Sequence, residues 1–173
     1  MKCIVISDNH YNKQPLVDVF DYYNGRGYKI FHCGDSELSS ADPIWQGVEN
    51  VIGNVDYDNG FPDEVVTQVN GVTIFMVHGH RHSVNYRLDD LVEDAKRHGA
   101  SIALYGHTHR LDAQIQDGVL CINPGSISVP RGTYRDTPTY VLLDIAPDLV
   151  TVDFYTKKHE KLEELNTSYK PTK

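Results

Sequence analysis

After Met1 the chain reads KCIVISDNH (residues 2–10), an apolar β-branched run that ends in four polar residues. Residues 2–7 are predicted to form a buried strand, because they are apolar and turn-forming residues follow them. A helical pattern opens at Pro15 and stops at Gly25, and a second strand is predicted at 28–33. This strand–helix–strand order favours parallel strands.

The rest of the chain carries a second helix and many hairpin signals. Asn70-Gly71 lies between two strand-like runs and predicts a hairpin. A second helix is expected around 88–95, with Gly99 as its stop. A short helix is expected to start at Asp42-Pro43. Further strands are predicted at 48–52, 64–69, 72–77, 101–105, 111–116, 119–122, 139–145 and 150–155. The pattern predicts an α/β fold in which two mixed β-sheets pack face to face with helices outside.

The length of 173 residues and the 40% hydrophobic content fit one domain spanning 1–173. The chain is charged from Lys157 onward, so its last dozen residues are expected to be mobile. No apolar run could span a bilayer and no signal peptide is visible, which predicts a cytoplasmic protein. Cys3, Cys33 and Cys121 lie in apolar runs and are expected to be reduced core residues.

The formal net charge of −8 argues against broad binding of long nucleic acid, which needs a basic surface. A phosphate-bearing substrate remains compatible with this charge, because bound cations would reverse the local field. Nine histidines stand out in the composition. Six of them fall within three short stretches: His10, His78, His80, His82, His107 and His109.

Five predicted strands end in similar polar residues. These ends are Ser7 to His10, Gly34-Asp35, Gly53-Asn54, His78 to His80, and Gly106 to His109. A lone Asp-x-His, Gly-Asp or Gly-Asn is ordinary turn chemistry, and a lone Gly-His-Thr-His is moderately specific. Five such ends in order should meet at one edge of the fold, where α/β sheets bind ligands. Carboxylate, amide and imidazole groups suit divalent manganese, iron, cobalt, nickel or zinc. Two ions about 3.5–4 Å apart need a bridging carboxylate, and Asp35 is the natural one. The preceding glycines permit tight turns.

These motifs, together with Asn-Pro-Gly-Ser at 123–126 and Pro130-Arg131, resemble the calcineurin-like metallophosphoesterase superfamily. Within it the chain is similar to the compact YfcE-like phosphodiesterase branch, which also contains the eukaryotic retromer scaffold subunit. The resemblance covers nearly the whole chain and implies a four-layer α-β-β-α sandwich with two metal ions. Mn²⁺ is favoured, with Ni²⁺, Co²⁺, Fe²⁺ or Zn²⁺ as alternatives. One ion would take Asp8, His10, Asp35 and His109, and the other would take Asp35, Asn54, His78 and His107.

The remaining polar residues are expected to play smaller parts. His80 and His82 match no usual ligand and are candidates for the pocket rim or the surface, and His32 and His98 are interpreted as structural. The candidate substrate contacts are Asn9, which also shapes the turn between two ligands, His80 and Arg131. Asn123 and Arg131 belong to motifs of the branch.

The chain departs from the pattern of the superfamily at one position. Many members of the superfamily carry a histidine that assists the leaving group where this chain has Val55. Valine cannot donate a proton, so hydrolysis of esters with poor leaving groups is in doubt. The YfcE-like branch also usually lacks this histidine.

The expected activity is hydrolysis of a small phosphodiester by a hydroxide that bridges the two ions, with Asp35, Asn54 and His78 contributing through it. A protein-interaction scaffold on the same fold is the alternative, since fold alone does not fix function. The complete set of seven ligands favours the enzyme. A nuclease acting on long nucleic acid is disfavoured by the acidic charge and the lack of a capping domain. The sequence leaves open whether the chain forms a homo-oligomer.

Overall fold

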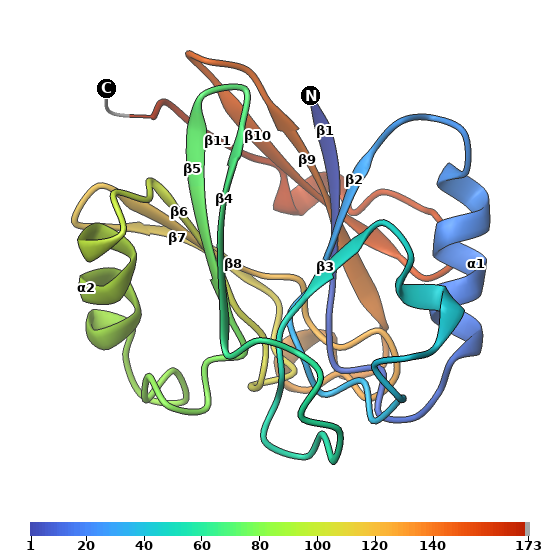
Figure 1. The fold of residues 1–173 in the computed structure, drawn as a ribbon. Helices are drawn as coiled ribbons and strands as arrows, with labels where there is room; N and C mark the ends of the chain where they lie inside the picture. The colour runs from blue at the N-terminus through green and yellow to red at the C-terminus, as the bar shows by residue number, and fades with distance from the viewer. Residues whose placement is uncertain (172–173) are drawn as a thin grey trace.

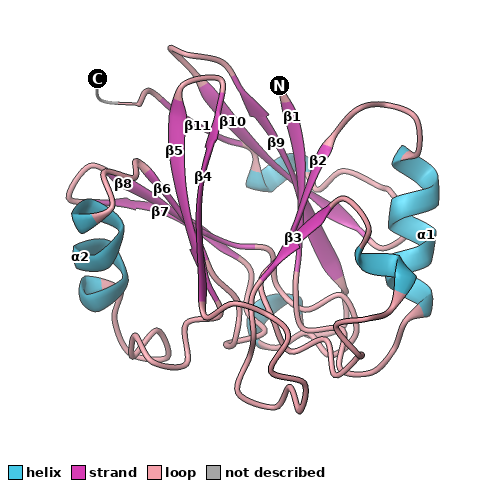
Figure 2. Ribbon diagram, viewed as in Figure 1, coloured by secondary structure: helices cyan, strands magenta, loops and turns pink. Residues whose placement is uncertain are grey.

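The computed structural model describes residues 1–171, which form two β-sheets packed face to face with a helix on each outer face (Figure 1). Figure 2 shows the same four layers coloured by secondary structure. The predicted α/β, α-β-β-α sandwich is therefore confirmed. The elements are β1 (Lys2–Ile6), α1 (Gln14–Tyr23), β2 (Lys29–His32), β3 (Val48–Asn50), β4 (Glu64–Val69), β5 (Val72–Val77), α2 (Asp89–Arg97), β6 (Ile102–Leu104), β7 (Asp112–Gln116), β8 (Val119–Asn123), β9 (Thr139–Ile145), β10 (Val150–Thr156) and β11 (Thr167–Tyr169), with 3₁₀ turns at Pro43–Trp45, Gly132–Tyr134 and Glu163–Leu165.

Both sheets are mixed. Sheet A has the order β11-β10-β9-β1-β2-β3, in which β1, β2 and β3 run parallel and the other neighbours pair antiparallel. Sheet B has the order β4-β5-β6-β8-β7, in which β5, β6 and β8 run parallel. The predicted Asn70-Gly71 hairpin joins β4 to β5, with both residues at positive φ.

The alternation of side chains along β1 divides the core into layers. Cys3 and Val5 join the cluster between the two sheets, and Ile4 and Ile6 join the cluster under α1. Because β1 is central and buried on both faces, its sequence is a continuous apolar run rather than an alternating one. Burying each such side chain contributes roughly 1.5–3 kcal/mol to folding.

Each helix covers one sheet with a single apolar face. Leu16, Val19 and Tyr23 of α1 pack on sheet A, and Leu91 and Ala95 of α2 pack on sheet B. These spacings of three and four residues place the side chains on one side of a helix. The helices thus cover the outer faces and leave the strand ends free.

The carboxyl ends of the parallel strands meet at one edge of the sandwich. The loops after β1, β2, β3, β5 and β6 gather at the lower edge of the view in Figure 1, between the two helices. This edge is where the sequence places its polar clusters.

The C-terminal segment corrects one expectation. Residues Thr167–Tyr169 form β11, which pairs with β10, and Tyr169 is buried in the core between the sheets. Up to residue 171, the last dozen residues are therefore packed against the sheet rather than forming an unpacked tail. Residues 172–173 lie outside the described part. A single aromatic residue in a charged stretch gave no core periodicity, so the sequence pattern missed this strand.

Two smaller expectations concern the cysteines and membranes. Cys3, Cys33 and Cys121 are free thiols and are buried, as predicted. Burial raises the pKa of Cys3 to about 11 and that of Cys121 to about 12, which keeps both thiols protonated near neutral pH. Within residues 1–171, no helix has the length and apolar character needed to cross a bilayer.

Candidate metal centre

Six of the seven predicted ligands form two groups, in each of which the donor atoms lie within 4.8 Å of one another. One group holds Asp8, His10 and His109, and the other holds Asp35, His78 and His107. The seventh residue, Asn54, lies against the second group. Its Oδ1 is 3.1 Å from His78 Nε2 and 3.0 Å from His107 Nδ1. The fold thus brings together side chains from five loops.

The first group brings three possible ligand atoms close together. His109 Nδ1 donates to the carbonyl of Val129 at 2.7 Å, and His10 Nδ1 donates to the carboxylate of Glu37 at 2.9 Å. The two Nε2 atoms face each other at 2.9 Å, so without an ion a second proton on one of the two rings must lie between them. Asp8 Oδ1 is 3.3 Å from His109 Nε2 and has no hydrogen-bond partner among the described residues, although it is buried. Such an arrangement needs a positive charge between the three atoms.

The second group has the same character. His78 Nδ1 donates to the carbonyl of Cys33 at 2.7 Å, which leaves Nε2 with its lone pair. This Nε2 faces Asp35 Oδ2 at 3.1 Å and Asn54 Oδ1 at 3.1 Å. Oxygen and imidazole donors on a common point fit a divalent transition metal ion. The donor chemistry of both groups therefore fits the cofactor expected from the sequence.

Titration of the first group points to the same need for a cation. The Asp8 carboxylate raises the pKa of His10 to about 9, against the opposing effect of burial, and Glu37 adds to the increase. Burial alone would raise the pKa of Asp8, but the adjacent imidazoles of His10 and His109 hold it well below its usual range. A proton is thus retained among these side chains, and a metal ion would displace it.

The backbone at the site is strained. Five candidate ligands have a left-handed backbone, with φ between 45° and 71°: Asp8, His10, Asp35, His107 and His109. Each such residue costs about 1–3 kcal/mol, and residues of this kind cluster at functional sites.

Two glycines permit the close approach of the loops. A Cβ at Gly53 would clash with the side chain of Asp35, and a Cβ at Gly106 would lie 2.6 Å from Asp8 Oδ2. The predicted role of glycines before the ligands is confirmed at both positions.

Residues behind the ligands fix their loops. Asn123 donates to the carbonyl of Gly106 at 2.9 Å and to Thr108 Oγ1 at 3.0 Å, and Ser126 Oγ donates to the carbonyl of Asp8 at 2.7 Å. The Asn-Pro-Gly-Ser motif at 123–126 therefore supports the loops of two ligands.

Two predicted substrate contacts have different positions. Asn9 is fully buried, and its Nδ2 donates to the carbonyls of Asn12 and Ser36 while its Oδ1 is hydrogen-bonded to His32 Nε2. The expected substrate contact is therefore wrong, whereas the expected role of Asn9 in shaping the turn agrees with these contacts. His80 lies beside the ligands, with its ring centroid 5.4 Å from that of His78, at the predicted rim.

The other histidines have structural contacts. His82 Nε2 lies 2.9 Å from Asp94 Oδ2 on α2, and the ring of His98 stacks on Phe75. His32 is fully buried, with both ring nitrogens hydrogen-bonded, to Asn9 Oδ1 and Gly34 N.

Sequence reasoning missed two supporting residues and one arginine. Asp56 accepts hydrogen bonds from the backbone of Asp35, and Glu37 orients His10. Arg110 lines a cavity that Arg131 also lines. Each of the three lies within three residues of a predicted ligand, but acidic and basic residues in loops are too common for that spacing to be a signal.

Known proteins resemble the chain over most of its length. The sequence profile of the calcineurin-like phosphoesterase superfamily domain matches residues 1–148. The chain is 33% identical over 165 residues to the Bacillus subtilis (strain 168) protein named "Probable metallophosphoesterase YsnB", covering 95% of this chain and 96% of that protein.

Solved structures share the fold. A crystal structure of a predicted phosphoesterase from Streptococcus pneumoniae TIGR4 matches with a TM-score of 0.92 and 37% identity, covering 98% of this chain and 97% of that one. The phosphoesterase Yfce from E. coli matches with a TM-score of 0.69 and 18% identity, covering 99% of this chain and 100% of its own. Vps29 proteins share the fold at 16% to 22% identity.

Proposed function

The chain belongs to the calcineurin-like phosphoesterase superfamily, and on this premise we propose that it is a metal-dependent phosphodiesterase acting on small phosphodiesters. Two divalent ions, with Mn²⁺ favoured, would be held by Asp8, His10, Asp35, Asn54, His78, His107 and His109, with Asp35 shared between them. When bound, the ions supply positive charge that activates water and stabilises the charge developing on the phosphoryl oxygens.

The observation that carries this proposal is the pair of facing nitrogens in the first group. His10 Nε2 and His109 Nε2 lie 2.9 Å apart, each on a ring whose Nδ1 is already hydrogen-bonded, next to the unpartnered Asp8 Oδ1. Without a metal ion such a cluster has to hold a proton, which a metal ion would displace. The second group of oxygen and nitrogen donors lies among the same loops, which supports a centre of two ions.

The protein's own residues keep this ligand set in place before substrate arrives. Glu37 and two backbone carbonyls, those of Cys33 and Val129, accept from the Nδ1 atoms of three ligand histidines. Each contact fixes a ring's tautomer and its orientation, so little reorganisation is needed on binding. The carboxylates of Asp8 and Asp35 supply the negative charge that balances the ions.

The residue at position 55 cannot donate a proton to the leaving group. The side chain of Val55 is 44% exposed next to Asn54 and has no proton to give. Phosphodiesters whose leaving groups depart as anions are therefore the substrates that these residues suit best.

A protein-interaction scaffold is the second candidate, because Vps29 proteins share the fold. A scaffold does not require two groups of metal-type donors, and buried carboxylates such as Asp8 are costly unless they are paired. The geometry therefore favours the enzyme.

The test is an assay of purified apoprotein with added Mn²⁺, Ni²⁺, Co²⁺ or Zn²⁺ against bis(p-nitrophenyl) phosphate, p-nitrophenyl phosphate and cyclic nucleotides. We expect diester hydrolysis that depends on added metal and that a chelator reverses. A protein that binds the metal but hydrolyses none of these esters would support the scaffold instead.

A further inference from the structure

A cavity of about 440 Å³ lies beside the candidate metal centre. We call it the arginine cavity; it is lined by Val84, Asn85, Tyr105, Thr108, Arg110, Leu111, Asp112 and Arg131. None of its lining residues is a candidate metal ligand. Thr108, however, stands between the ligands His107 and His109 in the chain, so the cavity adjoins the centre.

The two arginines of this cavity differ from the other five in the chain. Among residues 1–171, neither Arg110 nor Arg131 has an acidic partner within 4.0 Å or lies over an aromatic ring, although the net charge is −8. Each of the other arginines has such a partner: Arg26 with Tyr22 and Tyr23, Arg81 with Asp63, Arg87 with Asp89 and Asp90, Arg97 with Glu93 and Asp94, and Arg135 with Asp136. Two unpaired guanidinium groups in one cavity indicate an anion from outside the chain.

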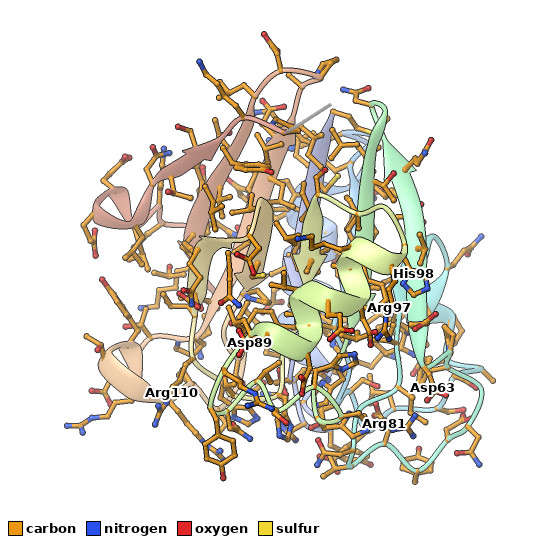
Figure 3. The ribbon with its side chains drawn as sticks, turned by 90° about the vertical axis from the view of Figure 1, so that its left-hand side faces the viewer. Asp63, Arg81, Asp89, Arg97, His98 and Arg110 are labelled. Atoms are coloured by element: carbon orange, nitrogen blue, oxygen red, sulfur yellow. The ribbon has the colours of Figure 1, made fainter. Side chains whose placement is uncertain are left out.

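Backbone contacts hold both arginines close to the ligand His109. Arg110 follows His109 directly, and the backbone N–H of Arg131 donates to the carbonyl of His109 at 2.8 Å. The stem of Arg110 lies along Gly132, because a Cβ there would be 3.3 Å from Arg110 Cγ. The two side chains thus start from adjacent backbone segments. In Figure 3 Arg110 lies at the lower left of the molecule, on the opposite side from the paired Arg97 and Arg81.

The acidic residue of the cavity is already engaged. Asp112 Oδ2 accepts from Tyr105 Oη at 3.3 Å and from Gln114 Nε2 at 2.6 Å. Asp112 forms no ion pair within 4.0 Å with Arg110 or Arg131, and two arginines against one aspartate leave the cavity lining with a net positive charge.

We propose that the arginine cavity is a second anion subsite, and that the substrates are phosphodiesters carrying a further phosphate group, which Arg110 and Arg131 bind. This inference rests on the proposed function, since the scissile phosphate would lie at the metal centre and the further phosphate in the cavity. Val84 and Leu111 add apolar side chains to the lining of the cavity, beside the charged groups. Guanidinium groups suit this role because they bind phosphate through two parallel hydrogen bonds.

The test is calorimetric titration of the Mn²⁺-loaded protein with adenosine 3′,5′-bisphosphate and with adenosine 5′-monophosphate. We expect wild type to bind the bisphosphate about tenfold more tightly, as one or two charge-assisted hydrogen bonds would give. Arg110→Gln and Arg131→Gln should each reduce this preference to about threefold or less, and the double variant should abolish it. Arg135→Gln is the matched control. Arg135 is exposed, lies outside the cavity and faces Asp136, so this variant should keep the wild-type preference.

The source of the second phosphate is tested with a second pair of ligands, glycerol 1,3-bisphosphate and glycerol 3-phosphate. If wild type prefers the bisphosphate over the monophosphate in this pair as well, the cavity accepts a second phosphate on any polyol. If it prefers the bisphosphate only in the adenosine pair, the substrate is a nucleotide. Binding does not require turnover, so a failure of the proposed function would appear separately, as absent hydrolysis of bis(p-nitrophenyl) phosphate. Equal affinity of wild type for both members of each pair, or an unchanged preference in the double variant, would overturn the subsite.

Discussion

The backbone N–H of Asp35 donates a hydrogen bond to Asp56 Oδ2 at 3.0 Å. The same carboxylate accepts from the backbone N–H groups of Gly53 and Glu37, each at 2.7 Å. One side chain thus joins the loop after β2, which carries Asp35, to the loop after β3, which carries Asn54. Asp56 touches no candidate donor atom, so it acts by positioning the loops.

Replacing Asp56 by Ala should weaken metal binding and stability together. Three backbone donors would lose their acceptor, which costs on the order of 1–3 kcal/mol of folding free energy. Metal affinity should fall about 10–100-fold, as is typical when a residue supporting ligands is lost. Metal titration and thermal unfolding measure the two effects. Asp58→Ala is the control, because Asp58 accepts from Ser40 N and Gly60 N in a similar way without touching Asp35. Equal metal affinities in the two variants would contradict the positioning role.

Metal analysis should find about two ions per chain after reconstitution with Mn²⁺. The expectation rests on the two donor groups, one around Asp8 and one around Asp35. Elemental analysis of the dialysed protein measures the ratio. Only one ion, or none, after full reconstitution would contradict a dinuclear centre.

Asp35→Asn should be the most damaging conservative change. If Asp35 is shared, both ions lose a charged ligand, and diester hydrolysis should fall by on the order of a hundredfold or more. His10→Asn is the comparison. Because His10 belongs to one group only, this variant should reduce the occupancy of one ion. Measured metal content should therefore distinguish the two variants. Turnover near the wild-type rate in Asp35→Asn would rule it out as the shared ligand.

His32 should make stability depend on pH. Burial lowers the pKa of His32 to about 4 from an ordinary value of 6.5. Between these values the unfolded chain binds a proton that the folded chain does not, so stability is lost as the pH falls from about 6.5 to about 4, by on the order of 3 kcal/mol in total. His32→Gln removes this contribution. Denaturant unfolding of both proteins across that range should show a smaller acid loss in the variant, and parallel curves would refute the prediction.

Val55 should give the enzyme a strong dependence on the leaving group. Aryl diesters, whose leaving groups depart without a proton, should be hydrolysed far faster than alkyl diesters, because a general acid typically contributes about 10²–10⁴ in rate. Val55→His should raise the rate selectively for alkyl esters. The substitution keeps the backbone N–H that donates to Asp35 Oδ1 at 3.0 Å. A wild-type rate that does not vary with leaving-group pKa, with chemistry rate-limiting, would mean that another residue supplies the proton.

Several features could be predicted from the sequence because they depend on local order along the chain. Short apolar runs that end in Asp, Asn or His predicted both the strands and the polar residues at their carboxyl ends. Parallel strands bring those ends to one edge of the fold. The seven candidate ligands and the two mixed sheets followed from this pattern. The buried strand Thr167–Tyr169 did not, because one aromatic residue gives no periodicity.

The sequence by itself therefore determined which side chains gather at the centre, since strand direction and the period of two are local properties. Only the tertiary structure decided how those side chains are used. It buries the amide of Asn9 against His32, joins Asp56 to Asp35, and leaves Arg110 and Arg131 unpaired in one cavity. Hydrogen bonds and charges act over a few ångströms in space, whereas the residues concerned lie about 20 positions apart in the chain.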